Sequence, residues 1–282
     1  MKLIRFGEQG YEHPGVIIDD RYFDVSHIID DYNASFFSNG GREYLSTEIK
    51  KGWFKRIDQD VRLLPPIAHP SKIVCVGPDS NGDSLKKNEK IVNSPSIFLK
   101  SIAALSGPND NVILPRNSLK TDCEVELAIV IAKEARYVPQ AEAENYIGGY
   151  IMHNNYNDRD FQMEGKDQWA QDCSFDTFAP MGPFLATADE MKKPDNMRMW
   201  LKVNGDAVLE RTPVELAFEI PYLIHYVSQQ MTLLPGDVVS TGFGLRKRSI
   251  TGYLKDGDLV EAGIEGLGEC RQRIKSSMKQ GI

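Results

Sequence analysis

The stretch TDCEVELAIVI, residues 121–131, decides how this chain folds. Its apolar second half is rich in β-branched residues, which predicts a buried β-strand. In a strand, Glu124 and Glu126 point to the same face, about 7 Å apart along the backbone. Two such carboxylates are costly unless they are exposed, hydrogen-bonded or bound to a cation, and oxygen ligands of this type suit Mg²⁺, Mn²⁺ or Ca²⁺. The alternative is an ordinary strand with one wet face, because the E-x-E pattern is common.

Further runs of strand-forming residues surround this stretch, each bounded by turn residues. Helices are expected at 140–146 and at 214–229, the latter with a bend or break at Pro221, and a short turn is expected at 188–191 with Thr187 as N-cap. Asn204-Gly205 lies between extended arms and is a strong hairpin signal. The pattern predicts a β-rich α+β fold. The expected strands are KIVCV (72–76), SIFLK (96–100), NVILP (111–115), GGYIMHN (148–154), the hairpin arms within 198–210, DVVSTG (237–242) and the strands within 258–274.

The first 70 residues have a different character. Short extended stretches at 2–6, 15–18 and 22–25 precede a segment, 28–57, whose periodicity is closer to that of helices. The run LLPPIAHP at 63–70 then contains three prolines, which make a stiff extended connector. We therefore expect a small N-terminal domain over residues 1–70 and a larger domain over residues 71–282.

Composition excludes several classes of function. The 282 residues include 33 basic and 40 acidic side chains, a net charge of −7, which argues against a nucleic-acid binder and against adhesion to anionic membranes. No run is long and apolar enough for a spanning helix, and the N-terminal residues do not resemble a signal peptide. The four cysteines lie far apart, which fits reduced thiols. We expect a cytoplasmic protein that handles a small molecule.

A second polar cluster is HNNYNDRDFQ, residues 153–162, directly after an apolar strand. A β-scaffold often presents ligand-binding side chains at such a place, although Asn and Asp also serve local turns. Cys173 with His153 as its base is a further alternative, but isolated cysteines are more often small buried hydrophobes. Gly242-Phe243-Gly244 lacks the third glycine of a dinucleotide-binding turn, so no nucleotide cofactor is expected.

As a set, these stretches resemble the fumarylacetoacetate hydrolase superfamily, above all its bacterial members that act on 2,4-diketo-3-deoxy sugar acids. The resemblance rests on PSKIVCVG, FLK, GPNDNVILP, TDCEVELAIVI, YIGGYIMHNNYNDRDFQ, DTFAPMGPFLAT and MTLLPGDVVSTG. It implies a mixed β-roll domain of the C-terminal family type behind a small N-terminal domain, assembled as a homodimer. It also implies Mg²⁺ or Mn²⁺ and a small keto acid that is hydrolysed, decarboxylated or isomerised through an enolate.

The resemblance also assigns residues. Glu124 and Glu126 match a metal-binding pair, and Asn155 stands where a third ligand, an aspartate, is expected. Lys100 matches the lysine of the FLK stretch and is assigned a catalytic role. The assigned residues for substrate binding are Arg159, Gln162 and Phe243.

Departures from the family pattern leave two readings open. Asp83 stands at the position of a lid histidine that acts as base, and Lys86 stands at its glutamate partner. Cys173 stands where a lysine is expected, and Asn155 removes one negative charge from the metal set. The chain is therefore either an enzyme with altered keto-acid chemistry, with Asp83 as its catalytic group, or a degenerate member with a binding or regulatory role.

Overall fold

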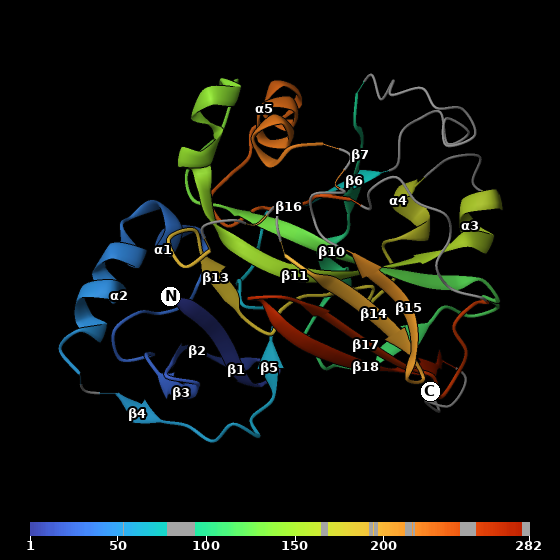
Figure 1. Ribbon diagram of the computed structural model, residues 1–282, viewed down its shortest axis with the longest axis horizontal. Helices are drawn as coiled ribbons and strands as arrows, with labels where there is room; N and C mark the ends of the chain where they lie inside the picture. Colours follow the sequence, from blue (N-terminus) through green and yellow to red (C-terminus); the bar gives the residue numbers. More distant parts are fainter. Residues whose placement is uncertain are drawn as a thin grey trace.

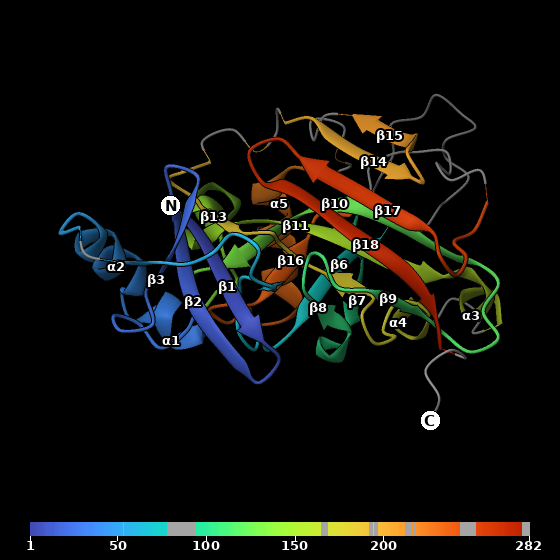
Figure 2. The same ribbon diagram turned by 90° about the horizontal axis from the view of Figure 1, so that it is seen from below.

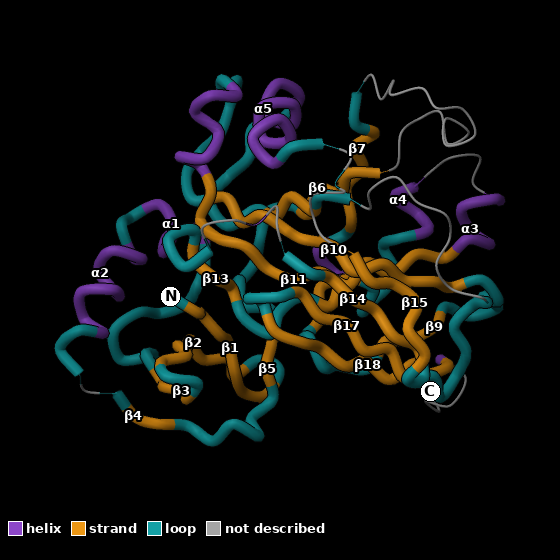
Figure 3. Tube along the Cα trace, viewed as in Figure 1, coloured by secondary structure: helices purple, strands orange, loops and turns teal. Residues whose placement is uncertain are grey.

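The structure is a computed structural model, and it describes residues 1–52, 54–77, 94–164, 169–191, 194, 197–211, 216, 218–242 and 252–277. Within these residues the strands form sheets of eleven, five and two strands. Figure 3 shows the strands gathered through the middle of the molecule and the helices around its edge. The expected α+β, strand-rich fold class is confirmed.

The largest sheet runs through most of the chain. Its centre is the antiparallel pair β10 and β11, and β16 joins β10 to the parallel neighbour β6. In sheet order the strands are β4 (Lys55–Arg56), β3 (Arg21–Asp24), β2 (Tyr11–Ile18), β1 (Lys2–Glu8), β13 (Leu185–Thr187), β11 (Ile147–Asp158), β10 (Thr121–Ile131), β16 (Val238–Ser240), β6 (Ile73–Gly77) and β7 (Ser96–Lys100), with β5 (Leu63–Leu64) paired to β1.

Strand β11 corrects one expectation from the sequence. The expected strand ends at residue 154, but residues 155–158 of the polar cluster continue it to Asp158 and pair with β10 along their whole length. All twelve residues of β11 are buried. The polar side chains of this half therefore lie inside the molecule on both faces of the sheet.

The five-stranded sheet packs across the central pair, as Figure 2 shows. Its hairpin is the predicted one, because Asn204 and Gly205 have φ values of 54° and 87°, the left-handed conformations that a tight hairpin turn requires. Its order is β15 (Asp206–Arg211), β14 (Met199–Val203), β17 (Leu259–Ile264), β18 (Gly268–Ser276) and β9 (Val112–Leu114), and the two-stranded pair is β12 (Ala179–Pro180) with β8 (Leu105–Ser106).

Helices lie at both ends of the molecule (Figure 1). α1 and α2 accompany the N-terminal strands, α3 and α4 lie at the opposite end, and α5 packs on the 3₁₀-helix η3. None of the described helices is long and apolar enough to cross a membrane. The bounds are α1 (Ala34–Ser38), α2 (Gly41–Ile49), α3 (Arg159–Glu164), α4 (Trp169–Asp172), α5 (Ile220–Gln230), η2 (Ile102–Ala104) and η3 (Gln140–Tyr146).

One expected helix and one expected cap need correction. Pro221 does not bend a longer helix. It lies in the first turn of α5, where its missing N–H has no intrahelical partner to lose. The expected short turn forms at residues 188–190, but the Thr187 hydroxyl bonds to Met1 and does not act as its N-cap: it donates to the Met1 carbonyl oxygen at 3.2 Å and accepts from the N-terminal amine at 2.6 Å.

The N-terminal strands are continuous with the large sheet. β1 pairs antiparallel with β13 through Lys2 opposite Ala186 and Leu3 opposite Leu185. The expected helical segment at 28–57 contains α1 and α2, and Asn33 caps α1 by accepting from the Phe36 amide at 3.1 Å. The division of the chain at residue 70 stays a prediction.

Candidate functional site

The register of β10 and β11 gathers polar side chains on one face of the sheet. Glu124 lies opposite Asn155, and Glu126 lies opposite His153. Because strand side chains alternate between faces, these four residues share one face. Ser240 of β16 lies opposite Ala128 of β10 and therefore belongs to the same face. The structure thus unites both polar clusters found in the sequence.

Glu126 is a buried carboxylate within a hydrogen-bond chain. Its side chain is 1% exposed, and Oε1 accepts from the Asn155 amide Nδ2 at 2.8 Å. The Ser240 hydroxyl donates to Oε2 of Glu126, and the same hydroxyl lies 2.8 Å from Nδ1 of His153. Burial and the nearby Lys100 charge hold the pKa of His153 well below 6.5, so this imidazole is neutral.

Lys100, the last residue of β7, brings a positive charge to this face. It is 2% exposed, and its ammonium donates to Oδ1 of Asn155. It also donates to the carbonyl oxygens of Tyr156 at 3.0 Å and Phe178 at 2.9 Å. Burial lowers the pKa of Lys100 below its ordinary value of 10.5, whereas neighbouring Glu126 raises it. These three acceptors account for all three N–H bonds of the ammonium.

Arg159 begins α3 at the end of β11. Its Nε donates to Oδ2 of Asp122 at 3.0 Å, and its Nη2 lies 3.6 Å from Oε1 of Glu124. Asp158 fixes this junction, because its Oδ1 accepts from the backbone amides of Asp160 and Phe161 at 3.1 and 3.4 Å. The side chain of Arg159 remains 27% exposed, so a cation faces the outside of the cluster.

Asp172 is a residue that sequence reasoning missed. It ends α4, is 1% exposed, and neither carboxylate oxygen has a hydrogen-bond partner among the described residues. Burial raises its pKa from 3.8 to about 7, although Arg159 and Lys100 act in the opposite direction. A buried carboxyl without partners is costly and is typical of functional sites. An acidic residue directly before Cys173, where the family lysine is expected, was the available signal.

The structure therefore brings together five of the residues assigned from the sequence: Glu124, Glu126, Asn155, Lys100 and Arg159. Gln162 lies in α3. Asp83, Lys86 and Phe243 lie outside the described residues. Burial raises the pKa of Cys173 above 9.0, which works against the alternative of a thiolate nucleophile.

The donor set does not fit a divalent cation in this arrangement. Asn155 turns its NH₂ group, not its oxygen, toward Glu126, and its oxygen accepts from Lys100. Glu124 faces the guanidinium of Arg159. Within the described parts of the chain, no three His, Cys, Asp or Glu side chains are grouped so as to hold a metal ion. We therefore derive no chemical step through a metal.

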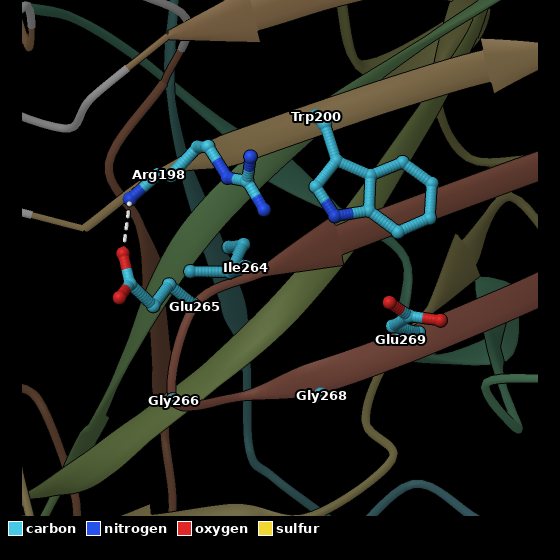
Figure 4. A pocket seen from close by; sticks show the side chains of 7 residues that line it. All are labelled: Arg198, Trp200, Ile264, Glu265, Gly266, Gly268 and Glu269. Atoms are coloured by element: carbon cyan, nitrogen blue, oxygen red, sulfur yellow. Dashed lines mark hydrogen bonds between the residues drawn. The ribbon is translucent and has the colours of Figure 1, made fainter.

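A separate hollow lies on the five-stranded sheet, with a volume of about 300 Å³. Figure 4 shows Trp200 and Arg198 of one edge facing Glu265 and Glu269 across it. The Arg198 amide donates to Glu265 at 3.2 Å. The buried charged face belongs to the other sheet, so this hollow is not part of the candidate site. Its lining residues are Arg198, Trp200, Ile264, Glu265, Gly266, Gly268 and Glu269.

Comparisons with known proteins agree with this architecture. A family model described as fumarylacetoacetate (FAA) hydrolase C-terminal matches residues 73–275. A 2,4-didehydro-3-deoxy-L-rhamnonate hydrolase of Sphingomonas sp. (strain SKA58) is 35% identical over 280 residues, which are 97% of this chain and 96% of that protein.

Two solved structures show the same fold over 98% of this chain and 99% of theirs, each at 27% identity. They are a fumarylacetoacetate hydrolase of the psychrophile Exiguobacterium antarcticum, with a TM-score of 0.84, and a maleylpyruvate hydrolase of Sphingobium sp. SYK-6 in complex with manganese(II) and pyruvate, with a TM-score of 0.81. On the family match and the identity to its relatives, this chain belongs to the fumarylacetoacetate hydrolase family.

Proposed function

We propose that this protein acts on a small 2-keto acid of the acylpyruvate or diketo-deoxy sugar acid type. The reaction is C–C bond hydrolysis or a related lyase, decarboxylase or tautomerase step through an enolate. The observation that carries the proposal is the buried charged face of β10 and β11, where Glu126, Lys100 and Arg159 lie together. Such charges are expensive to bury, so a site of this kind is typical of binding or catalysis. The named activities of the relatives support the substrate class.

Arg159 is suited to hold the carboxylate of the substrate. Its planar guanidinium can form two parallel hydrogen bonds to a carboxylate, and it is the partly exposed cation of the cluster. Negative charge that develops on the keto oxygen would be stabilised by the fixed positive charge of Lys100. Because its N–H bonds are already used, Lys100 acts through its charge and not as a proton donor to the substrate.

Asp172 is suited to hold and release a proton. Its pKa of about 7 lies where a general acid or base is most effective near neutral pH. Asp83, the base assigned from the sequence, remains part of the proposal together with the substrate-binding residues Gln162 and Phe243. A cytoplasmic homodimer also remains part of it. Mg²⁺ or Mn²⁺ was expected at Glu124, Glu126 and Asn155, but the proposed steps do not depend on it.

A second candidate function is a catalytically degenerate protein that binds a keto acid or a partner without turnover. The observation that favours it is that the buried polar groups already form hydrogen bonds with one another. Glu126 is hydrogen-bonded by Asn155 and Ser240, and Lys100 by three acceptors. Polar groups that already have hydrogen-bond partners gain less free energy when they bind a reacting ligand.

The experiment is a turnover screen with acylpyruvates, oxaloacetate and diketo-deoxy sugar acids. We expect turnover of at least one substrate, and Arg159→Lys should raise its KM about tenfold, because the second parallel hydrogen bond is lost. Arg271→Lys is the matched control, since Arg271 is an exposed arginine paired with Glu261 at 2.9 Å on the other sheet. Absence of both turnover and calorimetric binding across the panel would reject the enzyme and favour the second candidate.

A further inference from the structure

The orientation of the Asn155 amide is fixed from both sides. Glu126 is an acceptor, so it must face the NH₂ group, which it does at 2.8 Å. The Lys100 ammonium is a donor only, so it must face the amide oxygen, which it does. The opposite orientation would set acceptor against acceptor and donor against donor. The chemistry of the two neighbours therefore determines how this amide lies.

This orientation excludes Asn155 as a ligand for a cation beside Glu126. To coordinate such a cation, the amide would have to turn its oxygen toward Glu126 and its NH₂ group toward Lys100. Two donors would then face each other at a position where Asn155 is 3% and Lys100 is 2% exposed. Unsatisfied donors at such a buried position are strongly disfavoured.

Lys100 cannot easily move aside to allow this turn. The Tyr156 carbonyl of β11 and the Phe178 carbonyl just before β12 hold its ammonium at 3.0 and 2.9 Å. Both anchors are backbone atoms of buried residues. Withdrawal of the lysine would take its donor away from the Tyr156 carbonyl and from Oδ1 of Asn155, and would leave the Phe178 carbonyl with the Tyr156 amide at 3.1 Å.

The carboxylates of the E-x-E pair are already matched by cations of the chain. Glu126 is linked through Asn155 to Lys100, and Glu124 lies 3.6 Å from Nη2 of Arg159. An aspartate at position 155 would add another carboxylate to a face that already carries Asp122, Glu124 and Glu126, and it would require further positive charge. The asparagine is neutral and offers a donor and an acceptor at once, which is what a position between Glu126 and Lys100 requires.

We propose that Lys100, joined to Glu126 through Asn155, takes the place of a divalent cation in this chain, so that the site binds a 2-keto acid without a metal. The ligand class rests on the proposed function. The replacement of the cation by Lys100 follows from the contacts of Lys100 and Asn155 alone.

The first test is a Mn²⁺ titration of the chelator-stripped full-length protein, with free Mn²⁺ followed by electron paramagnetic resonance. The wild type should bind no equivalent of Mn²⁺ at about 1 mM. Asn155→Asp should bind Mn²⁺ at least about tenfold more tightly, because it adds a carboxylate beside Glu126. One bound equivalent in the wild type would overturn the proposal.

Asn157→Asp is the matched control for this titration. Asn157 lies two residues along β11 on the same face, is also buried, and donates to the backbone oxygen of Asn155 at 3.4 Å. It gains the same charge without facing Glu126. An equal rise in Mn²⁺ affinity in this variant would mean that added negative charge alone explains the effect, which would overturn the specific role of Asn155.

The second test is calorimetric titration with pyruvate, in EDTA and again with Mn²⁺. Binding in EDTA would support the metal-free site. Binding only with Mn²⁺ would overturn it while leaving the proposed function intact. Binding in neither condition would count against the proposed function, and the charge substitution would then be judged on the Mn²⁺ titration alone.

Discussion

Asn154 and Asn155 are consecutive, identical in type and almost fully buried, yet they lie on opposite faces of β11. Asn154 donates to Oε1 of Gln272 on β18 at 2.7 Å, and the Tyr156 hydroxyl donates to the same oxygen at 3.2 Å. Asn155 lies between Lys100 and Glu126. One asparagine belongs to a neutral cluster between two sheets, and its neighbour belongs to a charged one.

The two faces differ in the free-energy cost of burying their polar groups. The neutral face exchanges hydrogen bonds with water for hydrogen bonds within the protein, which stabilises the fold modestly. The charged face buries ions, and a buried ion pair is weak evidence for stability. On the proposed function, packing explains the residue types of the neutral face, whereas binding or catalysis explains those of the charged face.

The largest effect is expected for Lys100→Met. Loss of the ammonium leaves Glu126 without its counterion and removes a donor from the Tyr156 and Phe178 carbonyls, so we expect a loss of about 3–5 kcal/mol in the free energy of unfolding. Urea denaturation measures it. Lys120→Met, which removes a surface lysine that pairs with Asp160, should unfold close to the wild type. Equal free energies of unfolding for the two variants would show that Lys100 does not stabilise the charged face.

An intermediate effect that depends on pH is expected for Asp172→Asn. Because its pKa rises from 3.8 to about 7 on folding, Asp172 holds a proton between pH 4 and 7 that the unfolded chain has already released. Wild-type stability therefore falls as the pH rises through this window and is lowest above pH 7.

The variant should be more stable than the wild type by about 2 kcal/mol at pH 8 and equal to it near pH 4. Urea denaturation at the two pH values measures the difference. Turnover should be lost, since asparagine cannot exchange a proton. A variant with the same stability gain at both values would show that the carboxyl is not titrating there.

The smallest effect is expected on the neutral face. Gln272→Leu removes the acceptor shared by Asn154 and Tyr156, so unfolding should become easier by about 1–2 kcal/mol. Calorimetric titration with pyruvate should give the wild-type affinity, because no charge near Arg159 changes. A weakened affinity would show that the two faces of β11 are coupled, which would contradict their separate roles.

The sequence was most informative where one physical signal dominated. β-branched runs located the strands, Asn204-Gly205 located the hairpin, and the spacing of Glu124 and Glu126 placed both carboxylates on one face. The fold class followed from these signals. The resemblance to the family supplied Asn155, Lys100 and Arg159, which the structure brings together.

What could not be read from the sequence depended on three-dimensional surroundings. Residues 155–158 carry polar side chains on both faces, a pattern that is also typical of a loop. The residues that satisfy this polar part of β11, Gln272 and Lys100, lie far from it in the sequence. Asp172 could be recognised as a candidate site residue only from its burial in the structure. Pro221 was compatible with a bend or with a helix start, and only the packing of α5 decides between them.

Asp158 has a consequence for protein engineering. Its carboxylate accepts from the hydroxyls of Ser118 and Thr121 as well as from the first amides of α3, so Ser118 and the first residue of β10 help to set where Arg159 lies. Directed evolution of ligand preference in this scaffold should therefore randomise Ser118 and Thr121. A library confined to the residues that line the charged face would leave that control untouched.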